Sequence, residues 1–418
     1  MLNKFRASFR PYTGVASLLG IYIIFGFAQA SNEFRVLFLE SLGMSATECG
    51  RVLAASSLLT ALSRPMAGVL ADKLRSRRAV YIGAVLSWMA VLALMLLTQN
   101  VRLAGFLLCA GIVPLISISE PVTYGMIEAS GVNAALQIPK LDYSLIRVCL
   151  SVGYSVINFL YTPIVNRFGP TAPFACTLVF AAVMLLFSNS LRRFETAPTQ
   201  NREKSSGNKL ELGRLFKNYY LVTFVLLNFI SALGSHTQNY IYYLIDAIGL
   251  DSSLVGTAIG IRVVGEIIIM PLVPLLKKKI SLPMMQALAC LFRILQMILF
   301  ITCKNPYIIM GGTVLNGFAA GISLASTAVY LRMMAPEGLD TTTLSLSTVM
   351  TNAGSILINL ASGIIVDTLG IFAVYRFSVA FLLLWLVLYF GTWAFGVYVL
   401  KKTPPVPMFI RKAPAEKH

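Results

Sequence analysis

Charged residues interrupt several long apolar runs, and one pair gives the first indication of chemistry. Arg262 and Glu266 lie four residues apart in GIRVVGEIIIM (residues 260–270), and Arg293 lies in the next apolar run. Residues four apart share one face of a helix, so Arg262 can pair with Glu266, while Arg293 offers a second cationic partner. A carboxylate that changes partners when it is protonated can couple proton movement to a conformational change. The alternative is a static buried salt bridge that joins two helices.

A polar stripe lies in the first apolar run, at spacings that place its members on one helical face. It consists of Gln29, Asn32 and Glu33. The corresponding run of the second half reads GSHTQNYIYY, and it supplies the titratable side chain of His236 and the amide of Asn239. We interpret both groups as the lining of a cavity, and the alternative is hydrogen bonding between packed helices.

Two further runs combine an acid, an arginine and an aromatic residue. Arg147 and Tyr154 lie seven residues apart, two turns along one helical face, and Glu120 lies in the preceding run within ISISEPVTYG. Charged groups bind hydroxyls and an aromatic ring packs on the apolar face of a sugar, so this combination suits a polyhydroxylated ligand. Glu128 competes with Glu120 for the position that faces the cavity, and the sequence leaves this choice open.

These residues lie in segments that are long and apolar enough to cross a membrane. The 418 residues are 57% hydrophobic and 12% charged, whereas soluble domains are roughly half apolar and a quarter charged. Apolar stretches of at least 18 residues recur twelve times, and each can cross a hydrocarbon core roughly 30 Å thick. They lie near residues 14–38, 51–71, 79–98, 103–127, 144–166, 172–190, 219–245, 253–276, 284–303, 307–331, 344–366 and 372–399. The sequence therefore predicts an all-α membrane protein with twelve transmembrane helices.

The distribution of basic residues predicts the orientation in the membrane. With both termini in the cytoplasm, the inner side holds 24 lysines and arginines and the outer side holds six, Arg35 among them. This asymmetry follows the positive-inside rule and explains the net charge of +17 without a nucleic-acid partner. The first run ends in Ala28-Gln29-Ala30 and resembles a cleavable signal peptide, but an internal repeat continues across it, so we interpret it as a span. We expect a multi-pass protein of the cell membrane.

Several classes of function lack their motifs in this sequence. The six cysteines follow no CxxC or Cys/His spacing, and the two histidines, His236 and His418, complete no metal site. No G-x-x-x-x-G-K-[ST] phosphate loop is present, and neither is a G-x-S-x-G or an H-E-x-x-H motif. We therefore expect no enzyme activity, no metal and no cofactor.

The sequence divides into two related halves. Residues 191–217 form the only long polar interruption, so we expect six spans in residues 1–190, a cytoplasmic linker at 191–217, six spans in 218–402 and a cytoplasmic tail at 403–418. A shift of 206 positions aligns three pairs, which are Gly43 with Gly249, Gly50 with Gly256, and Pro65 with Pro271. A shift of 201 positions aligns three more, which are Gly153 with Gly354, Asn158 with Asn359, and Gly169 with Gly370. Such repeats predict two pseudosymmetric bundles with a site at their interface near mid-membrane.

The loop RPMAGVLADKLRSRR (residues 64–78) carries a family signature. It matches the pattern G-x-L-A-D-[RK]-x-G-x-[RK]-[RK] at Gly68, Leu70, Ala71, Asp72, Lys73, Arg77 and Arg78. This loop resembles the signature of the major facilitator superfamily, which implies a fold of two six-helix bundles. The resemblance implies that Asp72 and the basic residues form a charge latch that breaks on opening. Arg75 replaces the usual turn glycine, and the alternative is an ordinary basic loop.

Within that superfamily the chain resembles the lactose-permease-like branch, which includes oligosaccharide and nucleoside proton symporters and aromatic-acid permease relatives. The resemblance gives Arg147 the place of the sugar-contacting arginine and Tyr154 that of the stacking tryptophan. It gives Glu266 and Arg293 the places of the coupling acid and arginine.

Span ten departs from that branch. It reads TVLNGFAAG, with Asn316 and Ala319 where a histidine and a glutamate are expected. Span seven has His236 in place of an acidic pair, so this histidine becomes the titratable group there. The candidates for proton coupling are therefore Glu266, Arg293, Arg262 and His236.

The resemblance implies a secondary active transporter that works by alternating access. We expect proton-coupled uptake of a small organic solute, namely a sugar, a nucleoside or an aromatic acid. The expected partners are this small-molecule substrate, protons and the lipid bilayer, and the expected functional unit is a monomer. Two alternatives stay open, which are a proton antiporter that exports amphipathic compounds and a non-transporting membrane sensor with the same fold.

Overall fold

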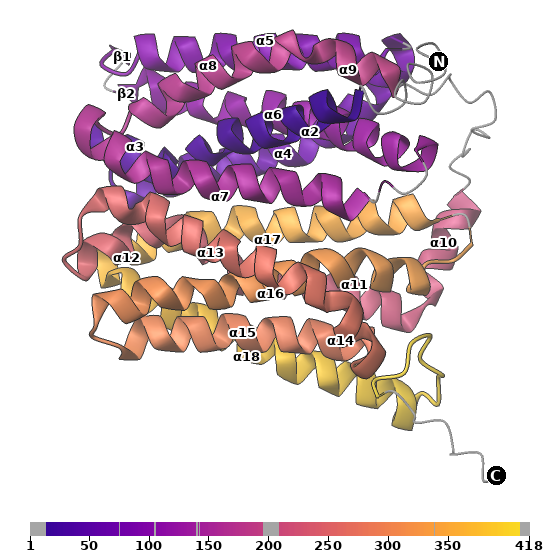
Figure 1. Ribbon diagram of the computed structural model, residues 1–418. Helices are drawn as coiled ribbons and strands as arrows, with labels where there is room; N and C mark the ends of the chain where they lie inside the picture. Colours follow the sequence, from indigo (N-terminus) through magenta and orange to yellow (C-terminus); the bar gives the residue numbers. More distant parts are fainter. Residues whose placement is uncertain are drawn as a thin grey trace, which may run out of the picture. The chain divides into compact units, whose positions relative to one another are not determined.

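The computed structural model describes residues 14–74, 76–103, 106–138, 141, 143–194, 209–337 and 339–409 (Figure 1). Residues 195–208 of the predicted linker and residues 410–418 of the predicted tail lie outside the described residues. Each of the twelve predicted spans corresponds to a helix, or to a short series of helices, in the described chain.

The first half contains its helices in the order of the predicted spans. They are α2 (Val15–Gln29), the 3-10 segment η2 (Ala30–Phe34), α3 (Arg35–Ser41), α4 (Ala46–Leu74), α5 (Arg77–Leu97), α6 (Leu108–Gln137), α7 (Tyr143–Phe168), α8 (Ala172–Leu186) and α9 (Ser188–Arg193). A short hairpin of β1 (Arg102–Leu103) and β2 (Phe106–Leu107) precedes α6. The span predicted at 103–127 therefore begins later, at Leu108, and continues to Gln137.

The second half repeats this pattern. Its elements are α10 (Lys209–Lys217), α11 (Tyr219–Ser235), η3 (His236–Tyr240), α12 (Ile241–Ala247), η4 (Ser252–Leu254), α13 (Val255–Ile269), η5 (Met270–Leu272), α14 (Val273–Lys279), α15 (Leu282–Thr302), α16 (Pro306–Met334), α17 (Asp340–Leu369), α18 (Ile371–Ala394) and η6 (Phe395–Val399).

The helices are long and apolar enough to confirm a multi-pass membrane protein. Ten helical stretches among the described residues can cross a membrane by length and composition. The other two predicted spans correspond to α8, a 15-residue apolar helix, and α4, which has 29 residues. At a rise of 1.5 Å per residue α4 is about 44 Å long, which is enough to cross the hydrocarbon core. The prediction of an all-α protein with twelve membrane-spanning helices is confirmed.

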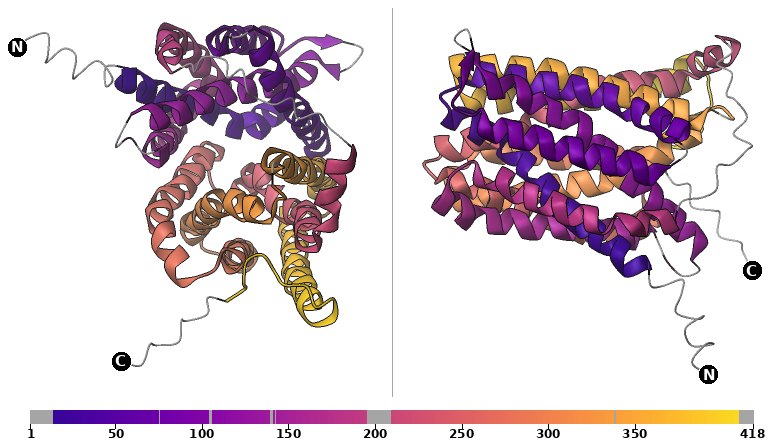
Figure 2. Two further views of the ribbon diagram at one scale, coloured as in Figure 1. Left: turned by 90° about the vertical axis from the view of Figure 1, so that its right-hand side faces the viewer. Right: turned by 90° about the horizontal axis from the view of Figure 1, so that it is seen from above.

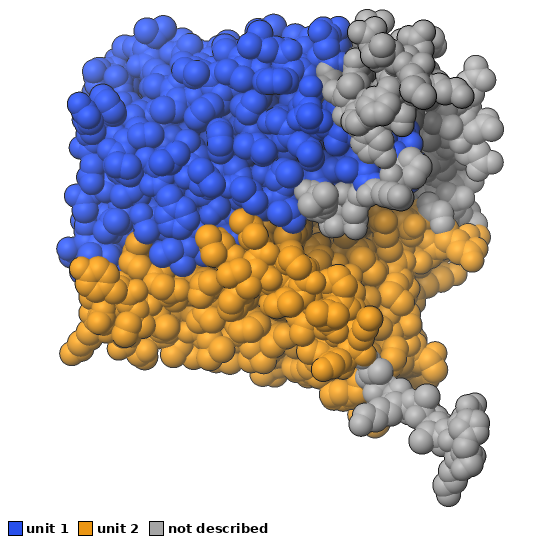
Figure 3. All heavy atoms as spheres, viewed as in Figure 1, with its two compact units in different colours: residues 1–202, 239–263, 359–368 blue, residues 203–238, 264–358, 369–418 orange. Residues whose placement is uncertain are grey.

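The chain forms two compact units, which Figure 3 distinguishes by colour. Unit 1 comprises residues 1–202, 239–263 and 359–368, and unit 2 comprises residues 203–238, 264–358 and 369–418. In unit 1, α2 packs against α7 and α8, while α6 packs against α4 and α5. In unit 2, α15 packs against α16 and α18, and α18 also packs against α11. Within each unit the long helices lie side by side with roughly aligned axes (Figures 1 and 2).

The backbone confirms the internal repeat at the level of single residues. Both first helices break into a 3-10 segment at matching positions, because η2 and η3 are 206 residues apart. The aligned Gly43 and Gly249 both have a positive φ, of 83° and 73°, just beyond α3 and α12. Gly169 and Gly370 share the same conformation, with φ of 83° and 79°. Glycine adopts positive φ at little steric cost, which explains why these aligned positions are glycine.

A second aligned glycine pair controls helix packing inside each unit. A Cβ atom on Gly153 of α7 would lie 2.5 Å from the carbonyl oxygen of Ile23 in α2. A Cβ atom on Gly354 of α17 would lie 2.5 Å from the carbonyl oxygen of Phe229 in α11. Ile23 and Phe229 are themselves related by the shift of 206 positions. The two halves thus use the same glycine contact to bring equivalent helices together, as small residues do in membrane helix interfaces.

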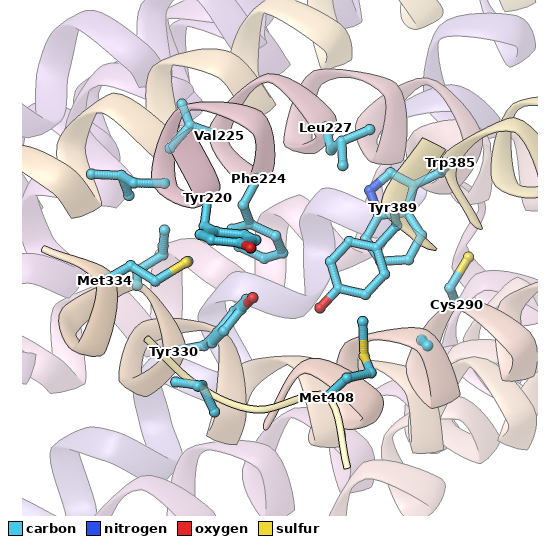
Figure 4. Packing of buried hydrophobic residues seen from close by; sticks show 14 of the residues in the cluster. Tyr220, Phe224, Val225, Leu227, Cys290, Tyr330, Met334, Trp385, Tyr389 and Met408 are labelled. Carbon is cyan, nitrogen blue, oxygen red and sulfur yellow. The ribbon is translucent and has the colours of Figure 1, made fainter. Parts of the chain in front are cut away.

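Unit 2 has an aromatic core at one end of α11, α16 and α18 (Figure 4). The ring of Phe224 meets that of Tyr330 edge to face, with centroids 4.9 Å apart. The rings of Trp385 and Tyr389 stack, with centroids 4.6 Å apart and planes inclined by 12°. Packing of this kind fixes the rotamers of the side chains involved, so Trp385 is held in one position.

The glycine contacts predict that alanine destabilises the protein at the tightly packed glycines and not at the glycines that contact nothing. Gly153→Ala and Gly354→Ala should each lower the free energy of unfolding by about 1–3 kcal/mol, because the new methyl group forces two helix backbones apart. The matched controls are Gly83→Ala and Gly311→Ala, since a Cβ at either position meets no atom within 4 Å. These controls should leave stability unchanged or raise it by up to about 1 kcal/mol. Unfolding of the detergent-solubilised protein measures the difference, and equal effects of all four substitutions would contradict the assignment.

Candidate functional site

The break in the first span presents polar groups inside unit 1. α2 ends at Gln29, and η2 carries Asn32 and Glu33 before the helix resumes as α3 at Arg35. A 3-10 turn has fewer residues per turn than an α-helix, so it rotates the side chains that follow it relative to a continuous helix. The predicted stripe is thereby directed to two different neighbours, one on α6 and one on α13.

Glu120 of α6 receives the first of these contacts and is almost fully buried, with 8% of its surface exposed. Its Oε1 accepts a hydrogen bond of 2.9 Å from the Gln29 amide, and its Oε2 accepts one of 2.6 Å from the Asn32 amide. Arg35 lies 3.6 Å from the same Oε2 and donates to Asn32 Oδ1 at 2.6 Å. A buried carboxylate is thus satisfied by two amides and one guanidinium, as the low dielectric of the interior requires.

Glu33 receives the second contact. Nη2 of Arg262 in α13 donates to its Oε1 at 2.9 Å, and the hydroxyl of Tyr154 in α7 donates to the same oxygen. The Glu33 side chain is 20% exposed and that of Arg262 is 27% exposed, so this pair is more accessible than Glu120. We refer to the connected set as the ionic network, which consists of Gln29, Asn32, Glu33, Arg35, Glu120, Tyr154 and Arg262.

Close packing of α7 and α13 explains how Arg262 reaches Glu33. A Cβ on Gly256 would lie 2.3 Å from the carbonyl oxygen of Asn158, so only glycine permits this approach. The hydroxyls of Thr162 and Thr257 lie 2.8 Å apart along the same contact. Gly256 and Thr257 thus hold α13 against α7 within two helical turns of Arg262.

Three predicted residues lie elsewhere in unit 1. Arg147 donates to the hydroxyl of Ser151 one turn along α7, at 3.3 Å. Glu128 accepts hydrogen bonds from the hydroxyls of Tyr124 at 3.2 Å and Tyr143 at 2.9 Å. Glu120, and not Glu128, is therefore the acid that joins the polar stripe.

The amide of Asn239 is the third of these residues. Its Nδ2 donates to Oδ1 of Asn359 at 3.1 Å. Asn359 in turn donates to the hydroxyl of Ser57 at 3.2 Å. Asn239 thus belongs to a separate amide and hydroxyl chain in unit 1 and not to the ionic network.

Unit 2 contains a polar pocket of about 230 Å³, which we call the Arg293 pocket. Predicted residues Arg293 and His236 line it, together with the amides of Asn228 and Gln286 and the hydroxyls of Ser323 and Thr327, among others. Nη2 of Arg293 donates to the Ser323 hydroxyl at 3.3 Å. The pocket therefore has a basic lining, in contrast to the mixed charges of the ionic network.

Glu266 and the predicted latch residues lie outside both the ionic network and the Arg293 pocket as defined above. Glu266 is half-buried in α13, and its Cα would lie 3.6 Å from a Cβ added at Gly321 of α16. Lys73 ends α4, while Arg77 and Arg78 begin α5. The side chains of Gly68 and Asp72 lie outside the described part of the chain, as does Arg75. The charge latch stays a prediction.

Several residues of these two sites, among them Arg35, Asn228, Gln286 and Trp385, are not among the candidates from sequence. By sequence Arg35 counts among the basic residues of the outer side, although it also lies inside the span predicted at 14–38, and this overlap is the available signal. Asn228 and Gln286 are isolated amides within apolar runs, which is a weaker signal of the same kind. Trp385 also lines the pocket, and nothing distinguishes it in sequence from an ordinary core aromatic residue.

Comparison with known proteins identifies relatives of this chain. The sequence profile described as the MFS_1 like family matches residues 17–377. The chain is 23% identical over 239 residues to the "Uncharacterized transporter YwbF" of Bacillus subtilis (strain 168), an alignment that spans 56% of this chain and 58% of that relative. The chain thus spans little more than half the length of this curated relative.

Solved structures share the fold. The crystal structure of the nucleoside transporter NupG superposes with a TM-score of 0.72 at 17% identity and covers 92% of this chain and 99% of NupG. The crystal structure of the peptide transporter POT in complex with sulfate gives a TM-score of 0.70 at 14% identity, covering 91% and 94%. The predicted fold of two six-helix bundles, that of the major facilitator superfamily, is confirmed.

The contacts of Glu120 predict strong coupling to Arg35. Glu120→Leu should lower the free energy of unfolding by about 3–5 kcal/mol, because it leaves the buried Arg35 guanidinium without a counter-charge. The double variant Arg35→Leu/Glu120→Leu should lose less free energy of unfolding than the sum of the losses of the two single variants, since neither charge then remains. Glu337→Leu, at an exposed position, is the control. Unfolding in detergent measures the free energy of each variant in this double-mutant cycle. Strictly additive losses would show that the pair does not interact.

Proposed function

Since the chain belongs to the MFS_1 like family, we propose that it is a secondary active transporter that takes up a small organic solute together with protons. The solute crosses the membrane by alternating access. The proposed solute is a sugar, a nucleoside or an aromatic acid. The proposed setting is the cell membrane, with both termini in the cytoplasm. NupG and POT, whose folds this chain shares, are a nucleoside transporter and a peptide transporter, which supports a solute of similar size.

The observation that carries proton coupling is the position of Glu33. Its carboxylate is held by a cation from α13 and by a hydroxyl from α7, and it is partly accessible. Protonation removes the negative charge, so the Coulomb attraction to Arg262 disappears and the Tyr154 hydroxyl loses a charged acceptor. Both contacts weaken in one step, which loosens the attachment of η2 to α13 and to α7.

The release of Arg262 then has a defined consequence. An arginine without a counter-charge costs about 2.5–3.5 kcal/mol at the centre of a membrane-spanning helix on insertion scales. Glu266, which lies one helical turn further along the same element, is a second carboxylate on the same face as Arg262. We propose that Arg262 alternates between Glu33 and Glu266, so that proton binding and helix movement are linked.

The two sites have different proposed roles. The ionic network, with Gln29, Asn32 and Glu120 as its fixed part, forms the proton-sensitive side of the machinery. The Arg293 pocket, with His236, supplies a place for the solute itself. Arg147 remains a proposed contributor to solute binding on the sequence resemblance alone, and Asn239 remains one because the internal repeat aligns it with Glu33 of the polar stripe.

A transport assay tests this proposal. Proteoliposomes that contain the full chain should accumulate radiolabelled lactose, uridine or benzoate only when an inward proton gradient is imposed, with alkalinisation of the outside. Glu33→Gln should abolish accumulation above the external concentration while it retains downhill exchange, because the neutral amide mimics one protonation state only. Glu337→Gln, an exposed acid, should behave as the unmodified protein.

The other outcomes discriminate between the alternatives. Solute efflux driven by an inward proton gradient would replace uptake by export in antiport. Solute binding without flux in either direction would favour the membrane sensor. Unchanged accumulation by Glu33→Gln would contradict the assigned role of Glu33.

A further inference from the structure

We propose that the Arg293 pocket binds the carboxylate group of a small organic anion, and that Arg293 is its specificity-determining residue. The inference deepens the proposed transport function and rests on it for the statement that the bound anion is the transported solute. It gives Arg293 a role in solute recognition in place of the coupling role that the sequence resemblance implies.

The charge balance of the pocket is the first observation. One permanently charged side chain, that of Arg293, lines it beside the imidazole of His236, and no aspartate or glutamate is among the lining residues. The recorded hydrogen bond of Arg293 is to the neutral hydroxyl of Ser323. A guanidinium has five N–H donors and a permanent positive charge, and one hydroxyl neutralises none of it. A buried cation inside a membrane is stable only with a counter-charge, and an anionic solute supplies one.

The unused donors of the pocket are the second observation. Trp385 is only 4% exposed and lines the pocket, yet its indole Nε1–H has no hydrogen-bond partner. The indole N–H groups of Trp88 and Trp393 also have no partner, and of these three tryptophans Trp385 is the one that lines the pocket, so it is the one that a solute in the pocket would contact. The lining amides are already engaged, since Gln286 donates to Ser326 at 2.8 Å and Asn228 donates to Ser347 at 2.8 Å. Arg293, with five N–H donors and a positive charge, is the donor of the pocket that best suits a carboxylate.

Size and shape limit the solute. The volume of about 230 Å³ lies below the roughly 300–1,000 Å³ of pockets that enclose a drug-sized ligand. A carboxylate attached to a single ring is therefore a better fit than a disaccharide. The ring can lie against Trp385, which is held by its stack on Tyr389 and belongs to the aromatic core in Figure 4. Arginine binds a planar carboxylate through two parallel N–H donors, which adds orientation to charge.

Ligand binding to the purified full chain tests the proposal with a matched pair of probes. Benzoate and benzamide have the same ring and nearly the same shape, but only benzoate is charged. Benzoate should raise the unfolding temperature and change tryptophan fluorescence, and benzamide should bind at least about tenfold more weakly. Arg293→Gln should weaken benzoate binding by about 10- to 100-fold, the range for a hydrogen bond to a charged group, and should remove the preference over benzamide.

Three controls identify the site. Arg376→Gln changes an exposed arginine of the same unit and should leave benzoate binding unchanged. Trp385→Phe should abolish the fluorescence response, whereas Trp393→Phe should preserve it. Arg293→Lys keeps the charge without the planar fork, and it should retain part of the preference for benzoate. The benzoate and benzamide comparison on the unmodified chain needs no variant, so it decides the question even where Arg293→Gln does not fold.

The outcomes separate this inference from the proposed function. Equal binding of benzoate and benzamide, or an equal loss in Arg376→Gln and Arg293→Gln, would overturn the anion site. Competition by inorganic phosphate as effective as by benzoate would overturn the assignment to a carboxylate with a ring. Uptake of lactose or uridine without benzoate binding would overturn the anion site and leave transport intact. Benzoate binding with no flux of any solute would retain the anion site and overturn the transport function.

Discussion

Charge in an apolar medium has to be paired, and the arrangement of the polar residues in this protein follows from that requirement. The side chain of Glu120 is satisfied by two amides and by Arg35, and Glu33 is satisfied by Arg262 and Tyr154. Each of these pairs joins helices that are far apart in sequence. The cost of an unpaired charge makes the contacts selective, because a charged side chain in this medium is stable only beside a group that compensates its charge. A protein that must change conformation can use this selectivity, since moving one proton alters which pairs are stable.

The internal repeat provides a common scaffold on which the two halves differ in chemistry. Both halves break their first helix at the same position and use a positive-φ glycine beyond it. The break in the first half carries the carboxylate of Glu33, and its Asn32 donates to the carboxylate of Glu120. The break in the second half begins at His236 and adjoins a pocket with a basic lining. Repeated backbone geometry therefore positions the functional groups, while their identity has diverged.

Much of the fold was predictable from the sequence, because it depends on local properties. Apolar length predicts the spans, and the aligned glycines predict where equivalent turns and close contacts occur. The polar stripe was also predictable, since its three members share a helical period. Residues such as Gln29, Asn32 and Glu33 are conspicuous in an apolar run for the same energetic reason that makes them functional candidates.

Pairing between distant helices was less predictable. The i, i+4 spacing predicts Glu266 as a partner of Arg262, and this pairing stays a prediction. The structure places Glu33, 229 residues away, 2.9 Å from Nη2 of Arg262, which no local spacing could indicate. A single sequence contains no information on which helices adjoin, so a local partner is the natural expectation. Arg35 counts by sequence among the basic residues of the outer side, but after the 3-10 turn of η2 its guanidinium contacts Asn32 and Glu120 inside unit 1. Trp385 has an ordinary aromatic sequence context, and its indole nitrogen is unpartnered like those of Trp88 and Trp393, so its place in the Arg293 pocket is what distinguishes it.

The account depends most on Glu33 changing its protonation state during the transport cycle. Infrared difference spectroscopy of the reconstituted protein, recorded between high and low pH, detects the carbonyl stretch of individual protonated carboxyl groups. We predict a carboxyl band that appears at low pH, disappears in Glu33→Gln and persists in Glu337→Gln. A spectrum that is the same in the unmodified protein and in Glu33→Gln would contradict the account, because Glu33 would then keep one protonation state throughout.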